Sequence, residues 1–207
     1  MRRFLLLGAL TLCLVIGVAR SEEDATAQLA QQLTAISQLS GHFSQSQRGA
    51  GAEGELTYAS GSFRLLRPSY FAWIISAPDD QEIIADGDTL WHYDRDLETV
   101  TRRPLGGAQM QSPLQVLSGD YQALRRDYEV TATGQGRFQL VPKSAQPAFR
   151  ELTLVFSDGT LGGMEILDNL GQLLLIEFTD LDRNPGLTPA DFVFKVPEDA
   201  DFFDYAQ

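Results

Sequence analysis

Two titratable side chains, His92 and Asp94, are the first candidates for chemistry in this sequence. They stand two positions apart in the segment LWHYDRD, so a strand would place both side chains on one face. A histidine that is oriented by a carboxylate is a typical general base. Because no nucleophile is recognisable beside this pair, we favour an exposed polar strand edge over a catalytic site.

The segment DLDRNPGLTPAD is similar to a calcium-binding loop. Its acidic and amide residues are spaced as calcium ligands are, at Asp180, Asp182, Asn184 and Asp191. However, Pro185 occupies the position where such a loop needs glycine, and proline cannot adopt the positive φ of that turn. The pattern therefore favours a polar loop over a calcium site.

Other motifs of catalysis or cofactor binding are weak. Carboxylates gather at expected hairpin ends, but solvated turns explain them better than a glycosidase pair does; they are Asp79, Asp80, Glu82, Asp86 and Asp88. With two histidines in the chain, a zinc site is not expected. The sequence contains no phosphate-binding glycine loop, nucleophile elbow or dinucleotide fingerprint. We therefore expect neither an enzyme nor a cofactor nor a metal.

The N-terminus has the pattern of an export signal. Arg2 and Arg3 precede the apolar run FLLLGALTLCLVIGV, and small residues follow it. The run is short for a membrane anchor, which needs about 20 apolar residues. We expect residues 1–21 to be a signal peptide, with cleavage after Ala19 as the alternative. Residues 22–207 then form one soluble domain, which we expect in the periplasm and as a monomer.

The charge of the chain argues against nucleic acid as a partner. The formal net charge is -12, with 16 Lys and Arg against 28 Asp and Glu, and it becomes -15 once residues 1–21 are removed. Nucleic-acid binding needs clustered basic residues instead. Cleavage also removes Cys13, so the mature chain has no thiol for a disulfide, a nucleophile or a metal ligand.

Two helical segments are expected within a chain of strands. Residues 24–39 carry leucine and isoleucine at helical spacing, with Asp24 as a plausible N-cap and Gly41 as the stop. In residues 112–127, Pro113 suits the first helical position, and Leu114 and Leu117 lie three positions apart. Both helices have apolar stripes that must be buried against a sheet.

The rest of the chain consists of strand-like segments separated by turns. About ten of them, from HFSQSQR to QLLLIEFT, follow one another at hairpin spacing. So many strands in one small domain must curl into a barrel or sandwich to remove their edges. The tail LTPADFVFKVPEDADFF is expected to form a short strand and coil.

Several strands are apolar on both faces, which an ordinary core does not require. The clearest case is YFAWII, at residues 70–75, and LLLIEF and FVF are similar. A core between the sheet and the helices explains most of these side chains. The alternative interpretation is a curved sheet that holds an apolar cavity closed by the helices.

The segment RPSYFAWIISAPDDQEIIADGDTLWHYD resembles the core signature of the LolA family, the periplasmic outer-membrane lipoprotein carriers. The matching residues are Arg67, Pro68, Phe71, Trp73, Pro78, Asp79, Asp86, Gly87, Leu90, Trp91 and Tyr93. Further matches follow in order over the whole mature chain, among them Gly136-x-Phe138-x-Leu140 and Phe192-x-Phe194. A glycine-rich stretch before the signature and a short acidic tail depart from the pattern. The tail leaves open whether an extra C-terminal strand is present.

The resemblance implies a mainly β fold, an unclosed antiparallel β-barrel with a helical lid over an apolar cavity. The cavity would receive acyl chains, and its candidate residues are Phe71, Trp73, Trp91, Leu114 and Leu117. Which of the alternating side chains point inward is left open. The resemblance also implies three partners: acylated lipoproteins as cargo, an inner-membrane ABC-type release complex, and an outer-membrane acceptor lipoprotein.

Arg67 has two interpretations. A surface arginine that pairs with Asp79 or Asp80 is one. The other follows from the family match at Arg-Pro: the guanidinium donates hydrogen bonds to backbone carbonyls of the lid, near residues 112–120, and latches the empty cavity shut.

Two other classes of function remain at this point. A carrier of another lipid or glycolipid could have the same half-barrel. A hydrolase of lipids or glycans is disfavoured, because no nucleophile and base are found together.

Overall fold

The computed structural model describes the backbone of residues 16–49, 54–105, 116–117 and 121–205, and side chains from Asp24 onward in these ranges. The helical elements are α1 (Ile16–Thr34), α2 (Tyr121–Asp127) and a short 3-10 helix, η2 (Pro189–Phe192). The first six strands are β1 (Gln38–Arg48), β2 (Leu56–Leu66), β3 (Tyr70–Ala77), β4 (Gln81–Asp86), β5 (Thr89–Asp94) and β6 (Thr99–Pro104). The others are β7 (Tyr128–Gly134), β8 (Arg137–Pro142), β9 (Glu151–Ser157), β10 (Thr160–Leu167), β11 (Leu173–Asp182) and β12 (Asp201–Asp204).

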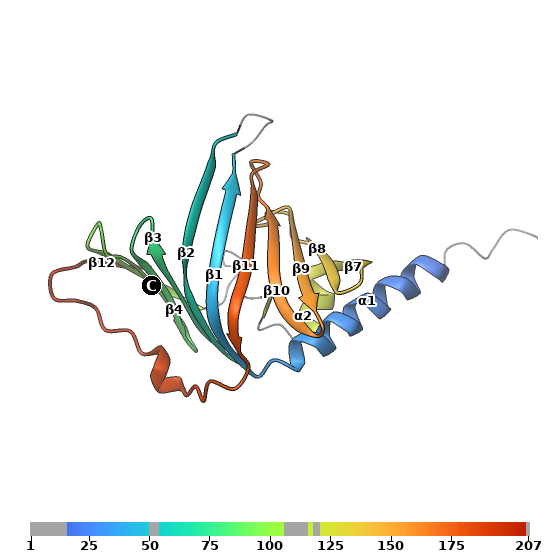
Figure 1. The fold of residues 1–207 in the computed structure, drawn as a ribbon, viewed down its shortest axis with the longest axis horizontal. Helices are drawn as coiled ribbons and strands as arrows, with labels where there is room; N and C mark the ends of the chain where they lie inside the picture. Colours follow the sequence, from blue (N-terminus) through green and yellow to red (C-terminus); the bar gives the residue numbers. More distant parts are fainter. Residues whose placement is uncertain (1–15, 50–53, 106–115, 118–120, 206–207) are drawn as a thin grey trace, which may run out of the picture.

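The described strands form one sheet with two open ends (Figure 1). Their order is β12-β6-β5-β4-β3-β2-β1-β11-β10-β9-β8-β7. Because β12 and β7 lie at opposite ends, the sheet is not closed. Most neighbours are antiparallel hairpin partners, whereas β12 pairs with β6 in parallel. The expected mainly β, unclosed antiparallel barrel is confirmed, and the C-terminal strand that the sequence left open is present.

The long strands β1, β2 and β11 form the centre of the sheet (Figure 1). A β-bulge interrupts the β2–β3 register between Ser60 and Gly61. At Gly61 the two backbones approach so closely that a Cβ atom would lie 1.8 Å from the carbonyl oxygen of Ile74. Bulges bend the strand that carries them, and a glycine tolerates the close approach. The sheet can therefore curve at this point.

Alternation along each strand separates two apolar clusters, one on each face of the sheet. On β3, Phe71 and Trp73 belong to the large core on the inner face. Ala72, between them in sequence, belongs to a smaller cluster on the outer face. The doubly apolar pattern of this strand therefore reflects two buried faces.

The inner face is covered by α1 and α2. Leu29 and Leu33 of α1 and Leu124 of α2 are fully or almost fully buried in the large core. The boundaries expected for the first helix were wrong. The helix extends to Ile16, so Asp24 is not its N-cap, and it ends at Thr34. The next apolar residue, Leu39, pairs with Leu65 inside the sheet, and this pairing takes it out of the helix.

The outer face is covered by the C-terminal segment, residues 183–205. Figure 1 shows this segment and α1 leaving the centre of the sheet in opposite directions. Phe192 of η2 is completely buried against Ala72 and Ile84, and Nη2 of Arg64 donates a hydrogen bond to the carbonyl of Asp191 at 3.3 Å. The tail that we expected to be strand and coil is therefore a 3-10 helix, an extended stretch and β12.

Candidate functional site

The centre of the inner face is a cluster of five aromatic side chains from four strands, which we call the inner cluster. Its members are Phe43, Phe63, Phe71, Trp73 and Phe178. The ring of Trp73 stacks on Phe43 at 3.7 Å between centroids, and its edge faces Phe178 at 6.2 Å. The ring centroids of Phe63 and Phe178 lie 4.8 Å apart. Such pairs add to the stabilisation that burial provides.

Apolar surface continues from the inner cluster toward β5. Ile75, Ile83 and Leu90 pack against the core but are only half-buried. The pairings Trp73–Ile83 and Ala85–Leu90 place them on neighbouring strands. This side of the inner face therefore offers apolar surface next to a tightly packed aromatic centre.

The elements above the inner face are called the lid here: α1, residues 116–117 and α2. Val116 and Leu117 are buried in the same core as the inner cluster. Because the lid fills the space over the inner face with its own leucine side chains, an apolar ligand and the lid must compete for one surface.

Arg67 joins two parts of the lid to the sheet. It follows β2 directly, and its backbone amide donates to the carbonyl of Ser37 at 3.0 Å. Its Nη1 donates to the carbonyl of Leu117 at 2.7 Å and to the carbonyl of Leu33 at 3.2 Å. The Leu33 carbonyl belongs to the last turn of α1 and also accepts the amide of Ile36 at 3.0 Å, and carbonyls at a helix C-terminus attract positive charge. One guanidinium therefore spans both lid segments.

This geometry favours one of the two interpretations of Arg67. Two of its side-chain hydrogen bonds go to lid carbonyls, and Leu117 lies inside the range 112–120 that we expected. Asp80 instead pairs with Arg95, whose guanidinium also contacts Glu82. The latching effect of these bonds stays a prediction, which the Discussion develops.

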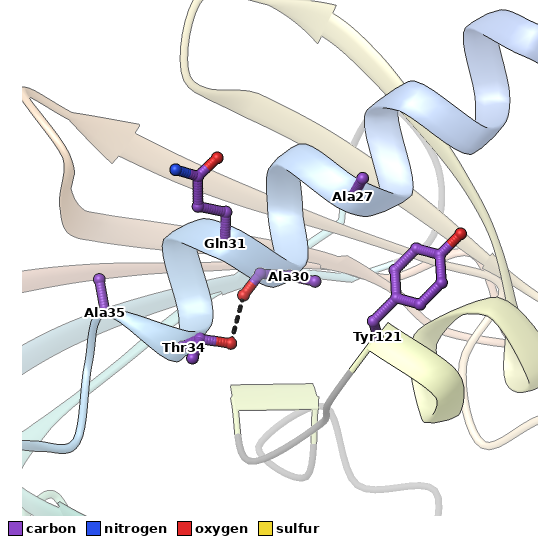
Figure 2. Close-up of a pocket in the computed structure, with 6 residues that line it drawn as sticks. All are labelled: Ala27, Ala30, Gln31, Thr34, Ala35 and Tyr121. Atoms are coloured by element: carbon purple, nitrogen blue, oxygen red, sulfur yellow. Dashed lines mark hydrogen bonds between the residues drawn. The ribbon is translucent and has the colours of Figure 1, made fainter.

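A shallow groove lies between α1 and α2 (Figure 2). Its volume is about 620 Å³, and its lining residues are Ala27, Ala30, Gln31, Thr34, Ala35 and Tyr121. The hydroxyl of Thr34 bonds back to the carbonyl of Ala30 at 2.7 Å. Most of these α1 residues are exposed and lie away from the helix face that carries Leu29 and Leu33. Two other lining residues, Ala30 and Tyr121, contact the large core, so the groove borders that core from the outside of the lid.

The structure brings together three of the five expected cavity residues. Phe71, Trp73 and Leu117 belong to one core. Trp91 belongs to the outer cluster, where its indole donates to Asp86 at 2.8 Å and stacks beside Phe194. Leu114 lies outside the described residues.

The sequence reasoning missed members of the inner cluster on other strands. Phe43 and Phe178 pair across β1 and β11, although their positions are far apart in the sequence. Phe63 is the third, and it pairs with Trp73 across β2 and β3. The alternation of large apolar residues on these strands could have indicated that they face the core. It does not indicate which strands are neighbours in the sheet.

His92 and Asp94 lie half-buried on β5, which pairs with both β4 and β6, so the expected exposed strand edge was wrong. The two side chains belong to a polar network. Gln81 bridges the two side chains: its Oε1 lies 3.3 Å from Nε2 of His92, and its Nε2 donates to Asp94 at 3.3 Å. Burial lowers the pKa of His92, Asp94 opposes this effect, and Arg103 adds to the lowering. A histidine whose pKa is lowered is neutral near pH 7 and suits this hydrogen-bonding role.

The carboxylates of the calcium-like segment hold turns. Asp182 accepts the amide of Asn184 at 2.8 Å, and Asp191 accepts the amide and the hydroxyl of Thr188 at 2.7 and 2.9 Å. The Thr188 amide is the main cause that lowers the pKa of Asp191. Among the described residues, no three His, Cys, Asp or Glu side chains gather as metal ligands.

An unclosed antiparallel sheet with an apolar inner face under a helical lid defines the class of half-barrel proteins with a covered apolar surface. A LolA superfamily protein from Nitrosomonas europaea has this fold, with a TM-score of 0.51 over 82% of this chain and 98% of that chain, at 10% identity. The family model described as outer membrane lipoprotein carrier protein LolA matches residues 34–195, and the chain belongs to this family.

Two relatives agree with this assignment over nearly their whole length. An outer-membrane lipoprotein carrier protein from Azotobacter vinelandii is 38% identical over 203 residues, which cover 96% of each chain. A protein of the same name from Cupriavidus necator is 38% identical over 189 residues, covering 88% of this chain and 89% of its own. The resemblance inferred from the sequence is therefore confirmed.

Proposed function

We propose that this protein is a periplasmic carrier that binds the acyl chains of lipoproteins released from the inner membrane and delivers them to an outer-membrane acceptor. The observation that carries the proposal is the apolar inner face beneath a lid that Arg67 bonds to the sheet. The names of the relatives support lipoproteins as the cargo.

Acyl chains need such a carrier because each exposed methylene costs about 0.8 kcal/mol in water. Three chains of about 16 carbons would together cost roughly 30–40 kcal/mol, so unaided diffusion through an aqueous compartment is negligible. The inner face can shield chains once the lid leucines move aside. Because the lid competes for the same surface, it also favours release.

The direction of transport requires two partners, one at each membrane. We infer an ABC-type release complex that loads the carrier and an acceptor lipoprotein that unloads it. The acidic chain favours basic patches on these partners, which would accelerate the encounter. We also infer that cleavage after residue 21 frees the domain from its export signal. None of the helices in the described part of the chain has the length and apolarity needed to cross a bilayer.

Native mass spectrometry of the protein isolated from the periplasm tests this function directly. We expect a bound lipoprotein, or its acylated N-terminal fragment, in a fraction of the molecules. A free phospholipid or glycolipid as the bound species would contradict the lipoprotein cargo and identify a carrier of another lipid. A protein that never carries an acylated molecule, even when lipoprotein release is active, would contradict the carrier function.

The two tryptophans of the chain report which face of the sheet receives the acyl chains. Trp73 lies in the inner cluster and Trp91 in the outer cluster. In a Trp91→Phe variant, we expect a diacylated lipopeptide to change the fluorescence of Trp73. In the matched Trp73→Phe variant, the emission of Trp91 should stay constant. The reverse result would place the lipid on the outer face and contradict the proposed cavity.

A further inference from the structure

Strand β12 forms one end of the described sheet, and none of the described strands pairs with its outer edge, which we call the open edge. It pairs with β6 in parallel, with Asp201 opposite Thr99 and Asp204 opposite Arg102. Within the described part of the chain, no further strand follows β12 in the sheet order. Figure 1 shows it at the far side of the sheet from β7. An edge of this kind is a template for an additional strand.

The backbone hydrogen bonds show which groups face this edge. The amide of Asp201 donates to the carbonyl of Glu98 at 2.8 Å, and the amide of Tyr205 donates to the carbonyl of Arg102 at 2.9 Å. The odd-numbered residues of β12 therefore bond to β6. Because successive residues of a strand point their amides in opposite directions, the amide and carbonyl of Phe202 point toward the open edge.

The side chains of β12 leave apolar area beside that edge. Phe202 is 45% exposed and Phe203 is 49% exposed. Phe202 stacks near Trp91, with 6.3 Å between ring centroids, so it lies on the outer face. Phe203 therefore points to the other face. An added strand would meet one large aromatic side chain on each face of the sheet.

The charge at this edge selects the kind of strand that fits. Residues 197–204 read PEDADFFD, with four carboxylates and no basic residue. One of them, Asp204, pairs with Arg102 at 3.4 Å. Pairing with a second copy of β12 would bring acidic residues into opposition, and like charges across two strands are destabilising. A partner strand that carries Lys or Arg would meet opposite charge.

We propose that the open edge of β12 binds an extended, basic segment of a partner protein by strand addition. The backbone amide and carbonyl of Phe202, which point toward this edge, provide the main-chain hydrogen bonds. The exposed phenylalanines contact alternate apolar side chains, and the acidic residues select a basic sequence. This binding site lies at the edge of the sheet, away from the inner cluster, so it does not depend on the identity of the cargo.

A labelled short peptide in which lysine and valine alternate is a suitable probe, titrated with the full mature protein and followed by fluorescence anisotropy. One control peptide has glutamate in place of lysine, and another has N-methyl groups on alternate amides. Two protein variants form a matched pair: Phe202→Pro removes the amide that faces the edge, and Phe202→Ala removes the same aromatic ring but keeps the amide.

We expect the lysine peptide to bind and the glutamate peptide not to bind. N-methylation should weaken binding, and Phe202→Pro should bind about threefold to tenfold more weakly than Phe202→Ala, which corresponds to one net hydrogen bond. Asp201→Lys should also weaken binding. Equal affinities for the methylated and unmethylated peptides, or for the two Phe202 variants, would show electrostatic association only and overturn the proposal. Dimerisation of the protein through β12 would overturn it as well.

Discussion

Replacement of Arg67 by leucine is expected to give a carrier that loads acyl chains but releases them slowly. The guanidinium bonds to the carbonyls of Leu117 and Leu33, so its removal takes away the hydrogen bonds that join both lid segments to the end of β2. Hydrogen bonds to a charged group contribute about 1.5–3 kcal/mol. Their loss shifts the lid toward the open state by roughly 10- to 150-fold. The lid then covers the inner face in fewer molecules, so the apparent affinity of the protein for its cargo rises by up to this factor.

The measurement is the rate at which a loaded fluorescent diacylated lipopeptide leaves the protein for acceptor vesicles, together with its affinity in a separate loading titration. Arg64→Leu is the matched control, because Arg64 lies on β2, three residues before Arg67, but bonds to Asp191 on the outer face. We expect Arg67→Leu to release slowly and Arg64→Leu to release at the wild-type rate. Release and affinity equal to wild type in Arg67→Leu would show that the two bonds do not hold the lid.

Only one of the two lid contacts of Arg67 could be predicted from the sequence. Its contact with the segment around residue 117 was expected, because the family signature related the Arg-Pro pair to the lid. Its second contact was not expected. The carbonyl of Leu33 lies at the end of α1, where it accepts both the amide of Ile36 and the guanidinium, whereas the helical spacing of Leu39 favoured a longer helix. Leu39 pairs with Leu65 in the sheet, and this pairing sets the C-terminal end of α1. The spacing of apolar residues along the chain gives no information about strand pairing.

The position of Trp91 shows that sequence alternation cannot assign side chains to the inner or outer face when both faces of a strand are apolar. Alternation indicates that Trp91 and Leu90 point in opposite directions, but it does not indicate which direction is inward. The outer face of β5 is apolar because Phe194 comes from the C-terminal segment to cover it. A partner about one hundred positions away in the sequence therefore determines the face of Trp91.

Strand β6 is hard to recognise from its sequence for a related reason. Its sequence, TVTRRP, has one buried apolar residue, Val100, and two arginines. Such a segment has little strand signal of its own. It is held by the hairpin with β5 on one side and by β12 on the other. The central strands, which bury large side chains on alternate positions, were predicted because their pattern is local.

Replacement of Phe192 by alanine is expected to release the C-terminal segment from the outer face while the inner core stays folded. Phe192 is completely buried, with its ring 5.6 Å from the Tyr70 ring and in one cluster with Ala72 and Ile84. Truncation of a buried phenylalanine to alanine costs about 3–5 kcal/mol. The loss falls on a single docked segment, so local opening should precede global unfolding.

Limited trypsin digestion measures this opening, because cleavage after Lys195 requires the segment to leave the sheet. When opening is fast relative to cleavage, the rate follows the open population, so Phe192→Ala should raise it by about 150- to 5,000-fold. Val193→Ala is the matched control, since Val193 is 64% exposed and its truncation removes little buried surface. Equal cleavage of the two variants would show that other contacts dock the segment. Unfolding of the whole protein at the same rate as the segment would show that the outer and inner clusters form one cooperative unit.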